Sequence, residues 1–310
     1  MKKIRTILSA TELLDTAFRR GSKIDRPENL AKIKVNAVAG ILTAKLNNYV
    51  KAFPSIDNLH PFHRELVGVL VKIDDLKHAL GAVQWCSERI SEVAKRFRGK
   101  DVSEPYGRIS SMVKRVAKEL TTLQDARKAL NSIPDIDPAK PIVIIAGPPN
   151  VGKSSLVAKM SSGKPMIASY PFTTKELSLG HADFDGILVQ IIDTPGLLDR
   201  PMEERNAIER QGIMALAHLD AAVVFLVDPS GTCGYETEYQ ERVLVEIAGM
   251  FTTDRLIVVE SKTDLKKAEG AKSKRGRLKI SVTKGEGLDK LKAQINEKLG
   301  LDAKREEMLF

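Results

Sequence analysis

The sequence has few cysteines, few aromatic residues and no long apolar run. Its 310 residues include two cysteines, one tryptophan and 5% aromatic residues in total. Cys86 and Cys233 fall in different predicted domains and match no ligand spacing, so we expect neither a disulfide partner nor a zinc site. No stretch of about 20 uncharged apolar residues occurs, and no apolar segment follows the basic start at 1–6. These absences favour a protein of the reducing cytoplasm without a membrane partner.

Positive charge is concentrated in the first part of the chain. Residues 1–139 contain 25 Lys and Arg against 16 Asp and Glu, whereas residues 140–310 contain 24 of each kind. The net charge of +9 therefore belongs to residues 1–139. A basic segment joined to a neutral one indicates a polyanionic partner for the basic segment. A solvated basic surface without a ligand is the alternative.

Residues 1–133 have apolar residues at helical spacing and no convincing strand. A capping box at Ser9–Glu12 predicts a first helix, and Pro27 opens a second helix that ends near Pro54. A long apolar stripe over 66–97 predicts a third helix. Because each stripe needs a partner surface, the simplest arrangement is a bundle of amphipathic helices.

The bundle is predicted to occupy residues 1–139. Asp74 and Asp75 can interrupt the third helix, and a last helix is expected from Ser103 to about Ile133. Two prolines without periodicity make 133–138 the linker to the rest of the chain. Basic residues cluster mostly off the apolar stripes, at Lys95, Arg96, Arg98 and Lys100, and again at Lys114, Arg115 and Lys118.

From Ile142 onward, short β-branched runs alternate with helical patterns. Strands are expected at 142–146, 176–184, 187–192, 221–227, 256–260 and 278–281. Helices are expected from 154 and at about 203–217, 235–249 and 287–299. This alternation predicts an α/β domain over 140–310 with a mostly parallel sheet, and ligands bind at the carboxyl ends of such strands.

The segment Gly147-Pro-Pro-Asn-Val-Gly-Lys-Ser154 follows the first of these strands and fits the P-loop pattern G-x-x-x-x-G-K-S without mismatch. Its glycines let backbone N–H groups converge on phosphate oxygens, and Lys153 can reach the β and γ phosphates. Ser154 offers its hydroxyl to Mg²⁺. The predicted nucleotide-binding residues here are Gly147, Pro148, Asn150, Val151, Gly152, Lys153, Ser154 and Ser155.

Two further loops are placed to reach the γ-phosphate and its metal ion. The polar-aromatic loop 169–175 supplies a threonine, for which we choose Thr174 over Thr173. The sequence Asp193-Thr-Pro-Gly196 ends a predicted strand, so Asp193 can hold a water on Mg²⁺ while the Gly196 N–H meets the γ-phosphate. The predicted metal ligands are therefore Ser154, Thr174 and Asp193.

The base should be read by Ser261-Lys-Thr-Asp264, directly after the strand at 256–260. The Asp264 carboxylate can accept from N1–H and the 2-amino group of guanine, which adenine lacks, so GTP is favoured over ATP. Lys262 can lay its stem over the base. Ser281 and Val282 can supply a backbone N–H to the guanine oxygen.

These motifs resemble the Obg-related GTPases of the TRAFAC class, and more narrowly their Nog branch, over nearly the whole chain. The G-domain segments that carry the resemblance are Gly147–Ser155, Tyr170–Thr174, Asp193–Asp199, Gly180-His181 and Ala215-Leu-Ala-His-Leu219. The N-terminal segments are Leu59-His-Pro-Phe-His-Arg-Glu-Leu66, Leu76-Lys-His-Ala-Leu-Gly81 and Ile133–Pro138.

The resemblance implies a magnesium-dependent GTPase that binds the large ribosomal subunit during assembly, with its helical bundle against ribosomal RNA. It further implies a compact, archaeal-type cytoplasmic member. The residues implied in catalysis are Lys153, Thr174, Gly196 and Asn150. Asn150 is included because the asparagine at this P-loop position helps related GTPases hold K⁺.

Two departures from the family pattern affect these expectations. Ser261 replaces an asparagine whose amide braces the P-loop and contacts the base, so we expect low nucleotide affinity. Val282 replaces an alanine, which leaves the guanine-oxygen contact assigned by position. In addition, Leu197 occupies the place where many GTPases have a water-orienting glutamine, so we expect slow hydrolysis without an activator. Two alternatives to a ribosome-assembly GTPase stay open. One is a nucleotide-gated RNA-binding switch with negligible hydrolysis, and the other is a potassium-dependent tRNA-modification GTPase.

Overall fold

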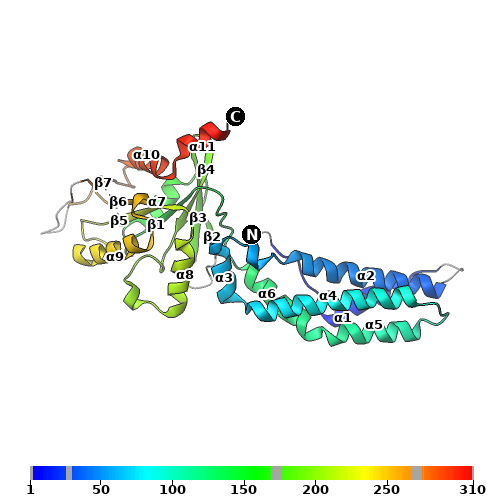
Figure 1. Cartoon of the computed structure of the whole chain (residues 1–310). Coiled ribbons are helices and arrows are strands. Elements are labelled where there is room, and N and C mark those ends of the chain that lie inside the picture. The colour runs from blue at the N-terminus through cyan, green and yellow to red at the C-terminus, as the bar shows by residue number, and fades with distance from the viewer. Residues whose placement is uncertain are drawn as a thin grey trace. The chain divides into compact units, whose positions relative to one another are not determined.

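The structure is a computed structural model that describes residues 3–25, 30–168, 170, 176–266, 274 and 276–308 (Figure 1). The chain divides into two compact units. One comprises Lys2–Leu59 and Val67–Ser132, and the other comprises His60–Leu66 and Ile133–Phe310. None of the helices in the described ranges offers a stretch that is long and apolar enough to cross a membrane.

The first unit is an all-helical bundle, as the apolar stripes predict. Its long helix α4 packs against α2, α5 and α6, while α1 packs against α2. Fully buried leucines and isoleucines such as Leu13, Leu42, Ile90 and Leu120 fill the space between the helices. Its helices are α1 (Ala10–Ser22), α2 (Leu30–Ala52), α4 (Ile73–Arg96), α5 (Ser103–Arg115) and α6 (Ala117–Asn131). Helix α3 (Pro61–Leu70) is divided, since residues up to Leu66 belong to the second unit and those from Val67 to the first.

The start of α1 confirms the predicted capping box. The Glu12 N–H donates to Ser9 Oγ at 3.3 Å, and the Ser9 N–H donates to Glu12 Oε2 at 2.8 Å. Near the other end of α1, a Cβ on Gly21 would lie 2.5 Å from Val38 Cγ2, so this glycine permits the close approach of α1 to α2. Pro27, expected to open the second helix, lies outside the described residues.

Two of the predicted helices are each divided into two. The third is interrupted just before Asp74, between the end of α3 and the start of α4 at Ile73. The aspartates then occupy the first turn of α4, where negative charge is favourable. The last helix breaks at Val116, whose φ of −98° and ψ of 19° leave helical geometry. Because the Val116 side chain stays buried, the apolar stripe continues through the break and conceals it.

The second unit confirms the predicted α/β class. Its sheet has the order β2-β3-β4-β1-β5-β6-β7, in which β4, β1, β5, β6 and β7 run parallel and β2 and β3 are antiparallel to their neighbours. The strands are β1 (Ile142–Ala146), β2 (Met166–Ala168), β3 (Leu177–Phe184), β4 (Ile187–Asp193), β5 (Ala221–Val227), β6 (Leu256–Glu260) and β7 (Leu278–Lys279). The helices are α7 (Lys153–Met160), α8 (Ala207–Ala217), α9 (Thr237–Met250), α10 (Leu288–Leu299) and α11 (Leu301–Met308).

Some of these elements differ from the sequence prediction. Strand β2 and helix α11 are not predicted, since each is short and β2 has only three residues. Strand β7 ends at Lys279 rather than Ser281, because the Ser281 N–H turns to donate to Glu286 O at 3.0 Å. The predicted helix at 203–217 begins only at Ala207, where Asn206 and Glu209 form a capping box.

The predicted linker is not a free tether. Ile133 and Ile136 are buried, and the Gln190 side chain pairs with the backbone of Asp137. The Asp137 N–H donates to Gln190 Oε1 at 2.9 Å, and Gln190 Nε2 donates to Asp137 O at 2.8 Å. These residues therefore belong to the second unit, whose longer segment starts at Ile133.

His63 lies in the part of α3 that belongs to the second unit. Its side chain is only 7% exposed, and its Nε2 has no hydrogen-bond partner among the described residues. Burial in this position lowers the pKa of His63 to about 4, from an ordinary value of 6.5. The folded protein therefore holds this imidazole neutral.

We predict that the protein loses stability on mild acidification through His63. The unfolded chain takes up a proton near pH 6.5 and the folded chain only near pH 4, so stability falls as the pH drops through this window. The slope is about 1.4 kcal/mol per pH unit, or roughly 3 kcal/mol over the window. Urea unfolding followed by circular dichroism at pH 7 and pH 5 should show this loss, and His63→Gln should reduce it. His78→Gln, at an exposed position, serves as the control, and equal pH dependence in all three proteins would contradict the prediction.

Candidate nucleotide-binding site

The P-loop joins the end of β1 to the start of α7 through three left-handed backbone positions. Gly147 has φ 131°, Asn150 has φ 62° and Gly152 has φ 102°. A Cβ on Gly147 would lie 2.5 Å from Leu226 O on the neighbouring β5, so glycine is required there by space as well as by φ. The exposed Asn150 is of the residue type that tolerates the left-handed region most readily after glycine.

Lys153 is the first residue of α7, and its side chain folds back under the loop. It is only 6% exposed. Its Nζ donates to Gly147 O at 2.7 Å and to Pro148 O at 2.8 Å. The ammonium group therefore lies within the P-loop itself, where a cation can meet the phosphates of a nucleotide.

Ser154 and Asp193 come together at the carboxyl ends of β1 and β4. Ser154 Oγ donates to Asp193 Oδ2 at 2.5 Å, and Asp193 is 1% exposed. The other carboxylate oxygen, Oδ1, has no hydrogen-bond partner among the described residues. Burial raises the pKa of Asp193, and the bond from Ser154 opposes that rise. A hydroxyl beside a buried, half-satisfied carboxylate is a donor set that fits Mg²⁺.

Thr174, the third predicted metal ligand, lies outside the described residues. The same holds for Ser169 and residues 171–175 of the predicted switch loop. Tyr170 is described, and its hydroxyl donates to Gly212 O of α8 at 2.8 Å. This bond ties Tyr170 to the helix that follows the D-x-x-G motif.

The glycine of the D-x-x-G motif already has a hydrogen-bond partner within the protein. The Gly196 N–H, expected to meet the γ-phosphate, donates to Asp199 Oδ2 at 2.7 Å. Asp199 is 4% exposed, and the buried Arg205 donates to Gly196 O at 3.3 Å and to Arg200 O. A carboxylate thus stands where the sequence predicts a phosphate oxygen, and Asp199 is a site residue that the motif alone does not reveal.

A cavity of about 700 Å³ lies beside the P-loop at the ends of β6 and β7. It brings together Val151, Gly152, Ser155, Ser261, Lys262, Asp264 and Val282 from the predicted set, and adds Ala158, Lys159, Leu265 and Thr283. Asp264 Oδ2 accepts from Thr283 Oγ1 at 3.4 Å, while Oδ1 has no hydrogen-bond partner among the described residues. Hydrogen bonding, chiefly from Ser281, lowers the pKa of Asp264, which keeps it a charged acceptor. The half-exposed Leu265 provides an apolar wall for a base.

Ser261 corrects the expectation that the brace to the P-loop is lost. The side chain is 1% exposed, and its Oγ lies 2.8 Å from Val151 O and 3.2 Å from Val227 O. A hydroxyl has one proton to donate, and the shorter distance favours the P-loop carbonyl. The brace is therefore kept by the hydroxyl, and what the serine gives up is the amide contact with the base.

Ser281 and Val282, which follow β7 and Ile280, do not share the predicted role equally. The Ser281 N–H is already bonded to Glu286 O, so it cannot also serve the guanine oxygen. Val282 lines the cavity directly. The predicted backbone contact therefore falls to the Val282 N–H.

Asp228 is a further residue that the motif search misses. It directly follows β5, is fully buried, and accepts from Lys262 Nζ at 2.8 Å. Lys262 has φ 54° and also donates to Thr232 Oγ1 at 2.8 Å, so its side chain is fixed at two points along the cavity. A charged residue at the carboxyl end of a wholly apolar strand is the sequence signal that could have identified Asp228.

A P-loop at the end of β1, the Ser154–Asp193 pair and a base cavity at Asp264 define a P-loop GTP-binding protein. Comparison with known proteins agrees with this class. The NOG1 N-terminal helical domain family matches residues 1–137, and the family of nucleolar GTP-binding protein 1 (NOG1) matches residues 207–264. The family of ferrous iron transport protein B matches residues 141–232.

Individual relatives extend the match over most of the chain. An uncharacterized protein of Methanocaldococcus jannaschii is 36% identical over 87% of this chain and 83% of its own length. Nucleolar GTP-binding protein 1 of Arabidopsis thaliana is 37% identical over 91% of this chain, but over 44% of its own length. A solved structure of nucleolar GTP-binding protein 1 from Plasmodium falciparum is 31% identical, with TM-score 0.48 over 57% of this chain and 95% of that chain.

The chain belongs to the NOG1 family of Obg-related GTPases. This confirms the resemblance drawn from the motifs, and it makes the chain a GTP-binding protein of that family. The chain spans about half the length of the nucleolar relatives that it matches.

We predict that Ser261→Ala weakens binding of GDP. Losing the hydroxyl removes a buried hydrogen bond and leaves the Val151 carbonyl without it, at a cost of about 1 kcal/mol or roughly fivefold in affinity. Ser261→Asn should bind GDP at least as tightly as the parent chain, because it restores the family amide. Titration with a fluorescent GDP analogue measures both, with Ser111→Ala on the exposed face of α5 as control. Unchanged affinity in Ser261→Ala would show that the brace contributes nothing.

Proposed function

We propose that this protein hydrolyses GTP slowly and acts in assembly of the large ribosomal subunit, with residues 1–139 contacting ribosomal RNA and residues 140–310 acting as the G domain. The observation that carries the proposal is that the net positive charge and the nucleotide-binding motifs lie in different parts of the chain. The +9 net charge belongs to the basic helical part, whereas the nucleotide motifs all belong to the neutral part. The name of the relatives, nucleolar GTP-binding protein 1, is consistent with ribosome assembly. A cytoplasmic location is part of the same proposal.

Mg²⁺ is the proposed partner of the nucleotide. Ser154 and Asp193 would hold it, directly or through water, with Thr174 as the third expected ligand. The ion would neutralise charge on the β and γ phosphates. The residues of this chain then orient the nucleotide: Lys153 meets the phosphates, Asp264 reads the guanine edge, and Asp228 holds Lys262 along the base cavity.

Slow hydrolysis is proposed from the surroundings of Gly196. Leu197 is fully buried and apolar, so it offers neither a donor nor an acceptor to an attacking water. The Gly196 N–H must also leave Asp199 before it can meet a γ-phosphate. Both features support a protein that depends on an activator or a cation for turnover.

The same two features favour the second candidate, a nucleotide-gated RNA-binding switch with negligible intrinsic hydrolysis. Single-turnover release of phosphate, with and without large ribosomal subunits, separates the two functions. A potassium-dependent tRNA-modification GTPase remains the third alternative and requires binding of tRNA.

We predict that K⁺ accelerates turnover and Na⁺ does not. Asn150 lies exposed at the tip of the P-loop, where its amide oxygen can help hold a monovalent cation beside the phosphates. A cation there stabilises the charge that develops in phosphoryl transfer, so the rate in K⁺ should be higher by about tenfold or more. Asn150→Ala should lose the difference while still binding GDP. Equal rates in the two salts would leave a partner-supplied residue as the source of charge neutralisation.

We predict that the chain binds ribosomal RNA through the exposed cluster Lys95, Arg96, Arg98 and Lys100, with a strong dependence on salt. Each phosphate that is neutralised releases counterions, so replacing all four side chains with glutamine should flatten the slope of log K against log salt by about two to four units. Affinity for GDP should stay unchanged. Filter binding to ribosomal RNA at several salt concentrations measures the slope. A variant of Lys114, Arg115 and Lys118 is the matched comparison, and an effect confined to that variant would move the contact there.

A further inference from the structure

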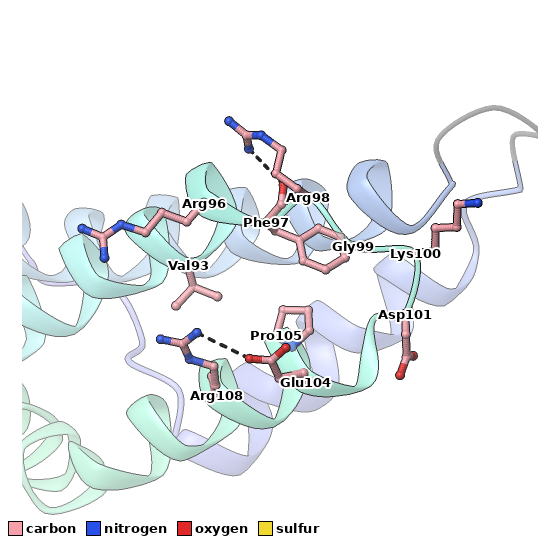
Figure 2. Close-up of a pocket in the computed structure, with 10 residues that line it drawn as sticks. All are labelled: Val93, Arg96, Phe97, Arg98, Gly99, Lys100, Asp101, Glu104, Pro105 and Arg108. Atoms are coloured by element: carbon pink, nitrogen blue, oxygen red, sulfur yellow. Dashed lines mark hydrogen bonds and ion pairs between the residues drawn. The ribbon is translucent and has the colours of Figure 1, made fainter.

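A cavity of about 370 Å³ lies at the turn between α4 and α5, within the helical unit (Figure 2). Its apolar part is formed by Val93, Phe97 and Pro105. Cationic side chains stand around it, contributed by Arg96, Arg98, Lys100 and Arg108. A cavity of this size accommodates a small organic group rather than an extended surface.

The aromatic ring of Phe97 is held in place. Its backbone N–H closes α4 on Val93 O at 3.1 Å, and the chain then turns so that Gly99 lies against the ring. A Cβ on Gly99 would approach Phe97 Cε2 to 3.1 Å. The ring is half-buried and points toward Pro105 across the cavity (Figure 2). A flat ligand can therefore stack on a fixed apolar face.

The carboxylates at this site are already engaged. Asp101 Oδ1 accepts from the Ser103 N–H at 3.0 Å and from its hydroxyl at 2.9 Å. Glu104 lies 3.6 Å from Arg108 Nη1. Within the described part of the chain, no acidic side chain forms an ion pair with Arg96 or Lys100. The rim is therefore available to anions on two sides of the ring.

Arg98 is fixed by the backbone rather than by an acid. Its Nη1 donates to Lys95 O at 2.6 Å and to Phe97 O at 3.0 Å, which closes the carboxyl end of α4. Besides Nη1, the guanidinium has donors on Nη2 and Nε that can meet an anion. This gives the ring a positioned cation as its neighbour.

We infer that this cavity binds one unpaired nucleotide of RNA, with the base stacked on Phe97 and the flanking phosphates on Arg96, Arg98 and Lys100. A base presents a flat face to an aromatic ring whatever its identity, and the phosphates on both sides of it require cations on both sides of the ring. A paired helix would meet the cations but could not bring a base to the ring. The inference rests on the proposed function, because it names what part of the RNA the basic cluster recognises.

The test compares three blunt RNA duplexes that are identical except at one position. One is fully paired, one has a single bulged nucleotide, and one has an abasic spacer at the bulge. The full chain should bind the bulged duplex about 5- to 100-fold more tightly than the other two, as expected for one stacked base. Phe97→Leu should lose this preference while keeping its affinity and salt slope on the paired duplex. Phe97→Tyr, which keeps the ring, should retain the preference and guards against an effect of misfolding.

The possible outcomes separate a failure of the nucleotide site in this cavity from a failure of the proposed function. Equal binding of all three duplexes by the parent chain, or a preference unaffected by Phe97→Leu, would overturn the nucleotide site while leaving RNA binding by the cluster intact. Displacement of the bulged duplex by an equal concentration of free 5′-AMP would show a mononucleotide site instead. No binding of any duplex or of ribosomal RNA at low salt would overturn the proposed function itself.

Discussion

The parallel pairing of β1 with β4 and β5 is the constraint on which the nucleotide site depends. In this register Ile145 lies beside Asp193 and Ala146 beside Phe225, so the carboxyl ends of three strands open at one edge of the sheet. Every residue of these three strands is buried except Leu188, so the register is fixed by apolar packing rather than by the site. The Ser154–Asp193 hydrogen bond follows from that register, because neither residue could reach the other from separate edges. The position of this pair is thus a consequence of the packing of the core.

Several polar groups of the site are hydrogen-bonded to one another. Lys153 donates to two carbonyls of the loop, Gly196 donates to Asp199, and Ser154 donates to Asp193. Buried polar groups without partners are costly, so these bonds stabilise the loops that form the site. Under the proposed function, a phosphate oxygen or a metal ion would compete with these partners for the same groups.

A feature could be predicted from the sequence where burial of a local segment determines it, and less well where contacts made in the folded chain determine it. Strands such as Ile142–Ala146 and Ala221–Val227 are predicted to the residue, because apolar β-branched runs with abrupt polar ends reflect burial alone. The break at Val116 is not, since the side chain stays in the core while the backbone turns. The sequence marks Asp228 only as a charge at a strand end, because its partner Lys262 lies 34 residues away and is brought to it by the fold. Asp199 lies only 3 residues from Gly196, but its bond to that N–H depends on the conformation of the turn between them. Motifs therefore predict where the loops of the site lie, whereas the tertiary structure determines which of their polar atoms are already hydrogen-bonded within the protein.

Discrimination for guanine illustrates that last point. The Ser281 N–H is bonded to Glu286 O, so the predicted backbone contact with the guanine oxygen would come from Val282 alone. Under the proposed function, Asp264 would carry most of the selectivity, because its lowered pKa keeps it a charged acceptor and adenine lacks the matching donors. Lys262 donates to Asp228, so its side chain is held beside the cavity that Asp264 also lines. The proposed recognition of guanine thus depends on one charged acceptor and one lysine that is held in place by a buried carboxylate.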